Sequence, residues 1–270
     1  MKWMSIRHRT VLSILGIAVV VLVGAAGARA DLLVNLTFDD PGASEGASIS
    51  STTNTGTLGG NGSGAGSVTY ARNDLAGGNF GADEANVNGL ISYTVPGGSL
   101  TADYTIMWAA RRDGTQAQFD KIMTTDNGEF GSFQFDGDGT NATWTIASRV
   151  QGFSLSDGVW HHFAMSYDHD GGQDGIKALV IWYLDGSEIG NNPFVDQQSF
   201  ASDITPYLLN QSNGTRPMNG AVDSFRLYDE VLGAGEIRQL AITAGIPEPA
   251  SLTLLAIAGL AVLHRRSRRA

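Results

Sequence analysis

Apolar and polar side chains alternate along the middle of this 270-residue chain. Val34, Leu36 and Phe38, for example, are separated by polar residues. Successive side chains of a β-strand point to opposite faces of a sheet, so this period of two predicts strands with one buried face. One short helix is expected at 235–241, after the last strand. The alternation recurs at 91–95, 104–108, 133–135, 144–146, 163–167 and 225–227, and the segment 178–184 is almost wholly apolar.

Asp-Gly pairs lie between these segments, at 136–139, 157–158, 170–172 and 185–186. Glycine adopts the positive φ that tight hairpin turns require. Many short strands joined by such turns predict an all-β fold, a two-sheet antiparallel jelly-roll sandwich. The glycine-rich stretch 56–66 is expected to form a flexible surface loop.

Residues 1–30 have the three parts of a secretory signal peptide. A basic start containing Lys2 and Arg7 precedes an apolar run at 11–23. The small residues Ala28 and Ala30 then provide the A-x-A ending that signal peptidase recognises. We expect cleavage after Ala30; the alternative is an uncleaved anchor helix.

Residues 246–270 form a second terminal segment. The triplet Pro247-Glu248-Pro249 precedes an apolar run at 251–263, which is short of the ~20 residues that a free-standing membrane-spanning helix needs. The run spans a bilayer if the basic side chains after it reach the headgroups, and these would then stay cytoplasmic. The alternative is an ordinary tail anchor. The basic residues are Arg265, Arg266, Arg268 and Arg269.

A Pro-Glu-Pro triplet, a short apolar helix and a terminal arginine cluster, in this order, resemble the PEP-CTERM sorting signal. The resemblance covers 246–270 and implies a partner, an exosortase-type membrane protease that cuts near Pro247, Glu248 and Pro249. It also implies export through the inner membrane, a transient C-terminal membrane anchor, and release to the cell surface or the extracellular matrix.

The body between these segments, 31–245, has the length of one domain. Eight of the 17 basic residues but only one of the 27 acidic residues lie in the terminal segments, so the body has a formal charge near −17. Such a charge disfavours nucleic acid as a partner and attracts divalent cations. The chain has no cysteine, which excludes disulfides and thiol catalysis.

Four segments of the body resemble laminin-G-like domains. They are LTFD at 36–39, GVWHHFAMSY at 158–167, IWYLDG at 181–186 and NGAVDSFRLY at 219–228. The matches reach from about residue 32 to residue 240. This family implies a concanavalin A-like jelly roll of two stacked sheets, in which a calcium ion is often held near the rim of the sandwich.

The sequence offers little for catalysis. His161 and His162 are adjacent on a strand and therefore face opposite sides, so we expect at least one to be a packing residue. Hydrolases of this fold carry an E-x-D-x-x-E run, which is absent here. Asp136 and Asp138 have a suitable spacing for a carboxylate pair but lie in a glycine-rich turn. We therefore expect no enzyme activity.

Asp223 is the most informative acidic residue. It has the strand parity of Phe225 and should point inward, where a carboxylate needs a partner. If the first and last strands pair, Asp39 or Asp40 would lie nearby and could share a structural calcium ion with Asp223. The alternative is that Asp223 accepts hydrogen bonds from local backbone amides.

These observations favour an exported domain that binds extracellular polysaccharide without catalysis. Two alternatives stay open: a structural or adhesive surface protein that acts through protein contacts, and a polysaccharide-cleaving enzyme on the same fold.

Overall fold

The computed structural model describes residues 30–72, 80–84, 89–100, 102–126, 128–136 and 139–244. The predicted leader apart from Ala30, the Pro-Glu-Pro tail and Asp138 lie outside these residues. No helix within the described ranges is long and apolar enough to cross a membrane.

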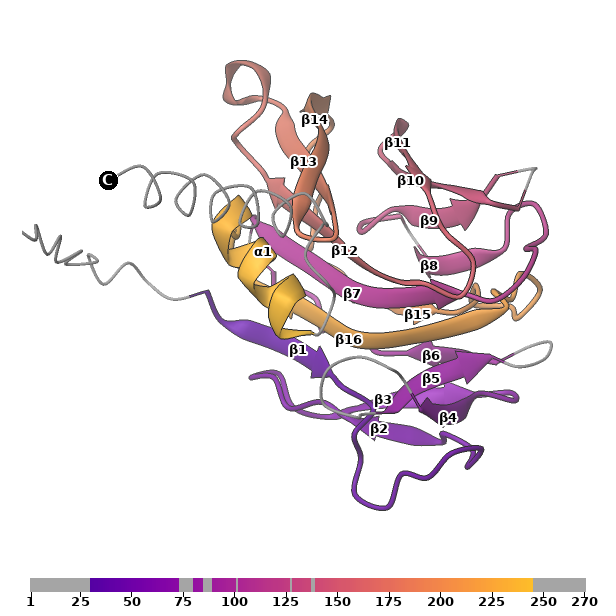
Figure 1. Ribbon diagram of the computed structural model, residues 1–270. Helices are drawn as coiled ribbons and strands as arrows, with labels where there is room; N and C mark the ends of the chain where they lie inside the picture. Colours follow the sequence, from indigo (N-terminus) through magenta and orange to yellow (C-terminus); the bar gives the residue numbers. More distant parts are fainter. Residues whose placement is uncertain are drawn as a thin grey trace, which may run out of the picture.

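The described chain consists mainly of β-strands, with a short 3-10 helix η1 (Gln173–Gly175) and an α-helix α1 (Ala234–Thr243) (Figure 1). The strands are β1 (Leu32–Leu36), β2 (Ser51–Thr53), β3 (Asn61–Ala65), β4 (Thr69–Arg72), β5 (Phe80–Glu84), β6 (Leu90–Ser92), β7 (Tyr104–Arg112), β8 (Lys121–Thr125), β9 (Ser132–Phe135), β10 (Asn141–Ile146), β11 (Arg149–Ser154), β12 (Trp160–Asp168), β13 (Ala178–Leu184), β14 (Ser187–Val195), β15 (Pro206–Leu208) and β16 (Gly220–Tyr228).

The strands form two antiparallel sheets that stack on each other. The first, called the β7 sheet, has the order β14-β13-β12-β7-β16-β5-β4, and β1 also pairs with β16. The second, the β8 sheet, has the order β11-β10-β9-β8-β15-β6-β3-β2. The predicted two-sheet jelly-roll sandwich is confirmed. The predicted pairing of the first and last strands is also confirmed, with Leu36 opposite Phe225.

Aromatic side chains fill the space between the sheets. Trp108 and Phe163 from the β7 sheet meet Phe133 and Trp144 from the β8 sheet, and all four are fully buried. The ring centroids of Trp108 and Trp144 lie 4.8 Å apart, as do those of Phe133 and Phe163. Aromatic pairs at such distances stabilise a core by about 0.5–1.5 kcal/mol each beyond the burial of their area.

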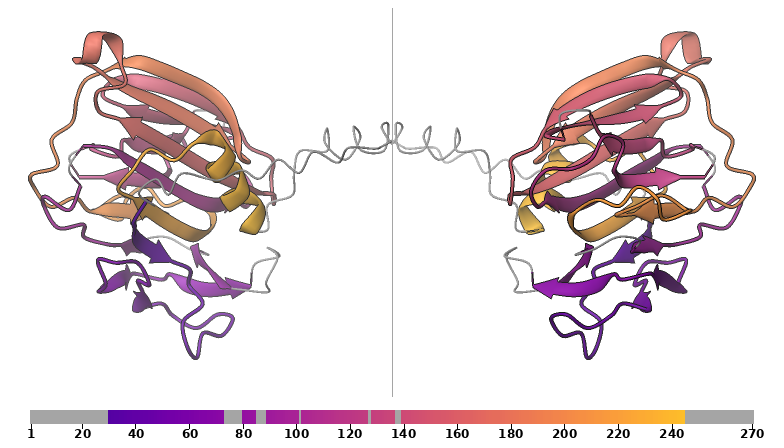
Figure 2. Two further views of the ribbon diagram at one scale, coloured as in Figure 1. Left: turned by 90° about the vertical axis from the view of Figure 1, so that its left-hand side faces the viewer. Right: turned by 90° about the vertical axis from the view of Figure 1, so that its right-hand side faces the viewer.

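Helix α1 packs on the outer face of the β7 sheet (Figure 2). Ile237 of the helix is fully buried and belongs to a cluster with Met107, Ala164 and Tyr183. The helix predicted at 235–241 is therefore confirmed. The helix begins after Gly233, whose backbone N–H donates to the Glu236 carboxylate at 2.9 Å.

The stretch 56–66 is not the flexible loop that its composition suggested. Residues Asn61–Ala65 form β3, which pairs with both β2 and β6. A side chain at Gly64 would place its Cβ 1.9 Å from the carbonyl oxygen of Ile49. The glycine is therefore required for the close approach of two backbones rather than for mobility.

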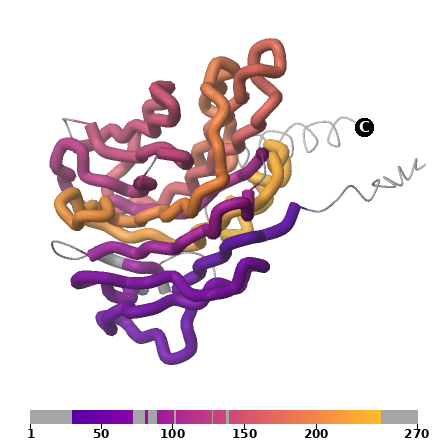
Figure 3. The backbone as a smooth tube through the Cα atoms, turned by 180° about the vertical axis from the view of Figure 1, so that it is seen from behind, coloured from indigo at the N-terminus to yellow at the C-terminus, as the bar shows by residue number. Residues whose placement is uncertain are grey.

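The two ends of the described chain lie on one side of the sandwich, near α1 (Figure 1 and Figure 3). The loops 113–120, 155–159 and 209–219 gather at the opposite edge, which we call the rim. Hydrogen bonds join these loops, for example from Gly114 to Asp157 and from Asn219 to Asp113.

Candidate functional site

The outer face of the β8 sheet carries a continuous row of mostly hydroxyl-bearing side chains, which we call the open face. Within the described residues no helix packs on this face, whereas α1 packs on the β7 sheet. The members of the row are cross-strand partners on seven successive strands, and each is at least partly exposed. They are Ser63, Ser92, Tyr207, Thr124, Ser132, Thr145 and Val150.

A second, shorter row lies beside the first on the open face. Lys121 is opposite Gln134, and Gln134 is opposite Thr143. All three are partly exposed, while the residues next to Gln134 and Thr143 on their strands are buried in the core. The period of two that fills the core with aromatic residues thus places hydroxyl, amide and ammonium groups on the open face.

A depression of about 290 Å³ lies on the same face beside β3 and β6, at the end of the sheet that is opposite β11. Its lining includes Asn61 and Ser63 of β3 and Ser92 of β6, together with Gly60 and Thr94. The open face therefore offers a hydrogen-bonding surface that reaches from this depression across the sheet to the rim.

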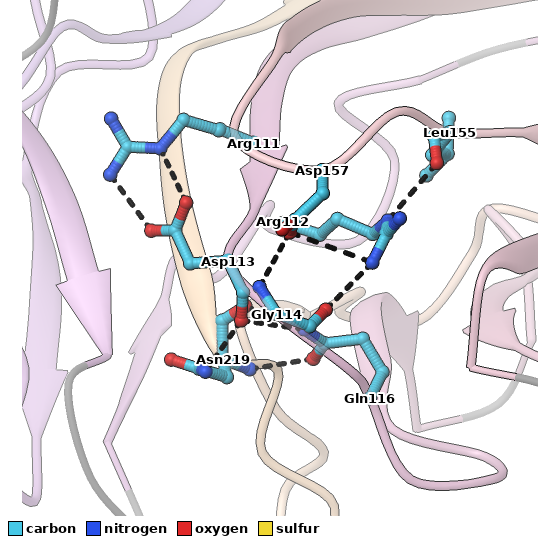
Figure 4. Close-up of polar contacts among 8 residues, drawn as sticks. All are labelled: Arg111, Arg112, Asp113, Gly114, Gln116, Leu155, Asp157 and Asn219. Carbon is cyan, nitrogen blue, oxygen red and sulfur yellow. Dashed lines mark hydrogen bonds and ion pairs between the residues drawn. The ribbon is translucent and has the colours of Figure 1, made fainter.

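The rim is fixed by a buried arginine, as Figure 4 shows. The side chain of Arg112 donates to the carbonyl oxygens of Leu155 at 3.0 Å and Gly114 at 2.7 Å. Its guanidinium also lies 3.6 Å from the Asp157 carboxylate. Gln116 completes the arrangement, because it donates to the Asn219 carbonyl and accepts from the Asn219 N–H, both at 2.8 Å. These contacts hold the loop 113–120 in one conformation.

Arg111, the neighbour of Arg112 on β7, points to the other face of the sheet. Its guanidinium makes a bidentate pair with Asp113, with N···O distances of 2.9 and 2.8 Å (Figure 4). It also lies over the ring of Trp160, 5.3 Å from the ring centroid. This arginine has its charge matched within the protein and is not available to a ligand.

Phe119 is the one large aromatic residue that the rim exposes among its described residues, and 40% of its surface is accessible. Its backbone has φ 71°, a conformation that side chains other than glycine rarely adopt. A hydrogen bond from its N–H to Phe135 holds it there. Arg216 lies over the ring, 5.0 Å from its centroid, and donates to the Gln118 carbonyl at 3.2 Å. Residues kept in such strained conformations are concentrated at ligand sites.

Lys121 lies where the rim meets the open face, two residues after Phe119. Its ammonium donates to Ser132 at 2.8 Å and to the side-chain oxygen of Gln134, and its backbone N–H donates to the carbonyl of Arg216. Burial, followed by the positive charge of Arg216, lowers the pKa of Lys121 to about 8. The site therefore holds two neighbouring cations.

The predicted orientation of Asp223 is wrong. Ser224 has φ 53° and lies in a bulge of β16, which shifts the register between Asp223 and Arg226. The bulge reverses the strand parity, so Phe225 faces the core while Asp223 lies on the outer face, beside Trp160 and opposite Ala109. Asp223 is still buried, at 3% exposure, and accepts a hydrogen bond from the Ser224 N–H at 2.5 Å. A hydrogen bond from a local backbone amide is what the alternative interpretation of Asp223 predicted.

Asp40 is held by hydrogen bonds from residues of β2 and β4. Its carboxylate accepts from the Thr53 N–H at 2.7 Å and the Tyr70 hydroxyl at 2.8 Å. Burial raises the pKa of Asp40, but these hydrogen bonds outweigh burial and keep that pKa below its ordinary value. Among the described residues, which include Asp39, Asp40 and Asp223, no three carboxylate or histidine side chains form a group able to hold a metal ion. Calcium binding stays a prediction, to be tested by whether calcium raises and chelator lowers the melting temperature.

The two histidines face opposite sides of β12, as predicted. His161 is on the parity of the core residue Phe163, and His162 is buried on the outer face, on the parity of Ala164. Both contact Asp185, which accepts from the ring nitrogen Nδ1 of His161 and from the backbone N–H of His162, each at 2.9 Å. Burial, followed by the charge of Arg226, lowers the pKa of His162 to about 4.

The turn at 185–186 explains this contact. Asp185 and Gly186 both have positive φ, 51° and 73°, as a two-residue type I′ hairpin requires. The predicted Asp-Gly turn is therefore confirmed, and its carboxylate fixes the neighbouring strand. Among the described residues the other ring nitrogen of His161, Nε2, has no hydrogen-bond partner, whereas a Ser-His-Asp triad pairs that nitrogen with its nucleophile.

The candidate carboxylate pair at the turn after β9 is only partly described. Asp136 is half-buried; its carboxylate accepts a hydrogen bond from the Thr143 hydroxyl at 3.4 Å, and its backbone N–H donates to the carbonyl oxygen of Asn141. Asp138 lies outside the described residues. A glycosidase pair depends on the distance between its two carboxyl groups, so whether Asp136 and Asp138 form such a pair stays a prediction.

Sequence reasoning did not identify Phe119, Arg216 or Lys121. Phe119 does give a signal, because it is a lone aromatic residue in a polar stretch between two strands. Arg216 gives none, since it is 97 positions further along the chain and reaches Phe119 only through the rim. The alternation of β9 and β10 does predict the polar row, once one face of each strand is known to be buried.

Comparison with known proteins agrees with this architecture. The family model described as the concanavalin A-like lectin/glucanases superfamily (Laminin_G_3) matches residues 91–238. No curated protein matches the chain.

Several solved structures share the fold at low sequence identity. Domain 4 of AbnA, a GH43 extracellular arabinanase from Geobacillus stearothermophilus in complex with arabinotriose, has a TM-score of 0.56 and 18% identity, over 78% of this chain and 98% of that one. The binding domain of botulinum neurotoxin DC in complex with rat synaptotagmin II has a TM-score of 0.57 and 13% identity, over 79% of this chain and 52% of that one. A structure of botulinum neurotoxin type C, whose cell entry depends on interaction with two ganglioside molecules, has the same TM-score and identity, over 79% and 51%.

This chain spans about half the length of the neurotoxin binding domains and nearly all of the arabinanase domain. Identities of this size establish a common fold. The family model covers more than half of the chain, including the segments 158–167, 181–186 and 219–228. The chain belongs to the concanavalin A-like lectin/glucanases superfamily.

Proposed function

We propose that this protein is an exported domain that binds polysaccharide, without cleaving it, on the open face of the β8 sheet. The observation that carries the proposal is the row of seven cross-strand partners from Ser63 to Val150, each at least partly exposed, of which five bear aliphatic hydroxyl groups. Hydroxyl and amide groups on neighbouring strands, about 4.8 Å apart, suit the closely spaced hydroxyl groups of a sugar chain.

The rim supplies the apolar contact that sugar recognition also needs. Phe119 offers an exposed ring on a loop that Arg112 and Gln116 hold in place. A ring fixed before binding loses little conformational entropy when a sugar packs against it. The relatives support this assignment, since domain 4 of AbnA was solved with arabinotriose and neurotoxin type C interacts with gangliosides.

A non-catalytic role fits the composition of the open face. Lys121 is the one charged side chain within the two rows, and the carboxylates of Asp126 and Asp136 accept hydrogen bonds from the row members Tyr207 and Thr143. A glycosidase of the usual kind places two carboxyl groups beside the scissile bond. Release of reducing sugar from a bound polymer tests this part of the proposal, and release at an enzymatic rate would contradict it.

Export and sorting are part of the same proposal. The leader with its predicted cleavage after Ala30 and the Pro-Glu-Pro tail would carry the body across the inner membrane. The described ends lie opposite the rim, so a chain held at either end would present the rim away from the membrane. Localising a tagged chain with and without the triplet Pro247-Glu248-Pro249 tests this step.

A second candidate function, adhesion through protein contacts, has its own observation. Strand β14 is an edge strand and exposes Ile189 and Phe194, at 36% and 45% of their surface, close to Ile176 at 68%. Unpaired edge strands with exposed apolar residues pair readily with other chains. The neurotoxin binding domain solved with synaptotagmin II shows that this fold also binds protein in a relative.

The experiment that separates the two uses the exported protein, produced from the full chain with its own leader, on an array of polysaccharides. We expect Phe119→Ala and Thr145→Leu to weaken binding at least about tenfold, which corresponds to about 1.4 kcal/mol. Phe194→Ala on β14 is the matched control and should bind as the wild type does. No glycan bound, or equal loss in all three variants, would reject the open face as the site.

A further inference from the structure

We propose that the open face selects acidic polysaccharides, with the carboxylate of a uronic acid residue bound between Lys121 and Arg216. The inference rests on the proposed function and names its ligand class. It depends on the charges at the corner where the open face meets the rim, and on how these charges differ from the rest of the molecule.

Lys121 is held with its charge uncompensated. Its ammonium is bound by Ser132 and Gln134, both of which are neutral. Among the described residues no carboxylate oxygen lies within 4.0 Å of this nitrogen. A half-buried ammonium that lacks a counterion gains free energy when an anion binds, because the cost of its partial desolvation is already present in the free protein.

Arg216 supplies the second cation. Its guanidinium packs over Phe119 and gives one hydrogen bond, to the carbonyl oxygen of Gln118. A guanidinium has five N–H donors, so this contact leaves most of them for a ligand. Among the described residues no carboxylate lies within 4.0 Å of this guanidinium, and the Asp120 carboxylate interacts with it from a longer distance.

Three other basic residues of the body lie beside carboxylates. Arg111 pairs with Asp113, Arg112 lies near Asp157, and Lys177 pairs with Asp196. With a formal charge near −17, the body has many carboxylates available for such pairs. Lys121 and Arg216 differ from these three because they are neighbouring cations beside an exposed aromatic ring, an arrangement that suits an anionic ligand.

The chemistry specifies the ligand further. A carboxylate accepts hydrogen bonds from an ammonium and a guanidinium together, while the sugar ring that carries it can pack on Phe119 and donate hydroxyl protons to Gln134 and Thr143. Elsewhere the acidic surface repels a polyanion. An acidic polysaccharide should therefore bind at this corner alone, and more weakly as salt is added.

The test compares polygalacturonate with its methyl ester, which keeps the backbone and removes the charge, against the exported protein by titration calorimetry. We expect polygalacturonate to bind at least about tenfold more tightly at low salt, as loss of one or two charge-assisted hydrogen bonds predicts. Raising the salt to about 0.5 M should remove most of the difference, because the Debye length is then about 4 Å.

Matched variants assign the effect to the site. Lys121→Gln and Arg216→Gln should each lose most of the preference for polygalacturonate, whereas Lys121→Arg should retain it. Lys177→Gln is the control, since it removes one positive charge from a pair with Asp196 at a distance from the open face. Unchanged melting temperatures show that the variants are folded.

The outcomes separate this inference from the proposed function. Equal binding of both polymers, or an equal loss in Lys177→Gln, overturns the acidic preference while the open face stays the binding site. Failure of every polysaccharide, charged or neutral, overturns both. A preference that persists in Lys121→Gln and Arg216→Gln would place the acidic ligand elsewhere on the protein.

Discussion

His162 shows how a single buried residue makes the stability of this domain depend on pH. It is 2% exposed and its pKa is lowered to about 4, first by burial and then by Arg226, with Asp185 acting in the opposite direction. An unfolded histidine titrates near 6.5, so between pH 6.5 and 4 the unfolded chain binds the proton more readily. The stabilisation is therefore complete above pH 6.5 and is lost as the pH falls towards 4, by about 3 kcal/mol at most.

Urea unfolding of the wild type and of His162→Gln at pH 7 and pH 4.5 measures this contribution. Carboxylates that titrate over the same range affect both proteins, so the difference between them isolates the histidine. We expect His162→Gln to lose less stability than the wild type on acidification. Parallel losses would mean that His162 does not titrate in this range.

Residue-scale predictions from sequence were correct where the strand was regular. The period of two placed His161 and His162 on opposite faces, and the Asp-Gly pair placed the turn at 185–186. The same parity failed at Asp223, because Ser224 adopts a positive φ and adds a bulge. Serine gives no sequence signal for such a conformation, and the hydrogen bonds that stabilise a bulge are made by other strands.

At the scale of elements, Thr105 joins helix α1 to the β7 sheet. Its buried hydroxyl donates to the carbonyl oxygen of Glu230 and accepts from the N–H of Leu232, both at 2.8 Å. Thr105→Val keeps the shape but leaves two buried backbone groups without a partner. We expect a loss of about 1–3 kcal/mol in the free energy of unfolding, together with faster amide exchange in α1.

Thr124→Val is the matched control, since Thr124 lies on the open face and, within the part of the chain that is described, its hydroxyl makes one hydrogen bond, 3.4 Å long, to the carbonyl of Thr125. It should leave both unfolding and exchange in α1 unchanged. If the α1 amides of Thr105→Val exchange at the wild-type rate, then the apolar cluster around Ile237 holds the helix without help from Thr105.

Element prediction succeeded for strands that alternate large apolar and polar or small residues, including the short β9, and failed for strands without that pattern, such as β3 and β14. Strands such as β7 and β12 bury large residues at every second position, and this pattern is visible in the sequence. Strand β3, NGSGA, has no such pattern, and pairing with β2 and β6 alone makes it a strand. Gly64 is explained by the backbone of Ile49 and Gly62 by the side chains of Thr52 and Leu36, so only the assembled sheet shows the role of these glycines.

At the scale of the whole molecule, the sandwich separates two tasks. The ends of the described chain lie at one edge with α1, and the rim and its exposed Phe119 lie at the other. Processing at the ends should therefore leave the binding surface unchanged. We predict that exported protein and protein produced without leader and tail bind the same polysaccharide with equal affinity. A difference in calorimetric affinity of more than about tenfold would show that the two edges are coupled.

The N-terminal edge carries a prediction of its own. The backbone N–H of Asp31 donates to the Asp229 carboxylate at 2.8 Å, and the N–H of Asp229 donates to the carbonyl of Asp31 at 3.3 Å. Cleavage after Ala30 would turn that N–H into an ammonium group already positioned on a carboxylate. The predicted cleavage therefore converts a hydrogen bond into an ion pair, worth at most about 1 kcal/mol because the pair is exposed to solvent.

The sign of the pH dependence identifies this pair. An α-amino group titrates near 8 and is shifted upward by a carboxylate, so the stabilisation is present below pH 8 and is lost as the pH rises above it. We expect the intact mass of the exported protein to begin at Asp31, and Asp229→Asn to lower its melting temperature at pH 7 but not at pH 10. Protein that keeps one extra glycine before Asp31 should show a smaller effect of Asp229→Asn at pH 7, because its charge lies one residue away. Equal effects in both forms, or at both pH values, would mean that Asp229 binds the backbone of Asp31 and not the new terminus.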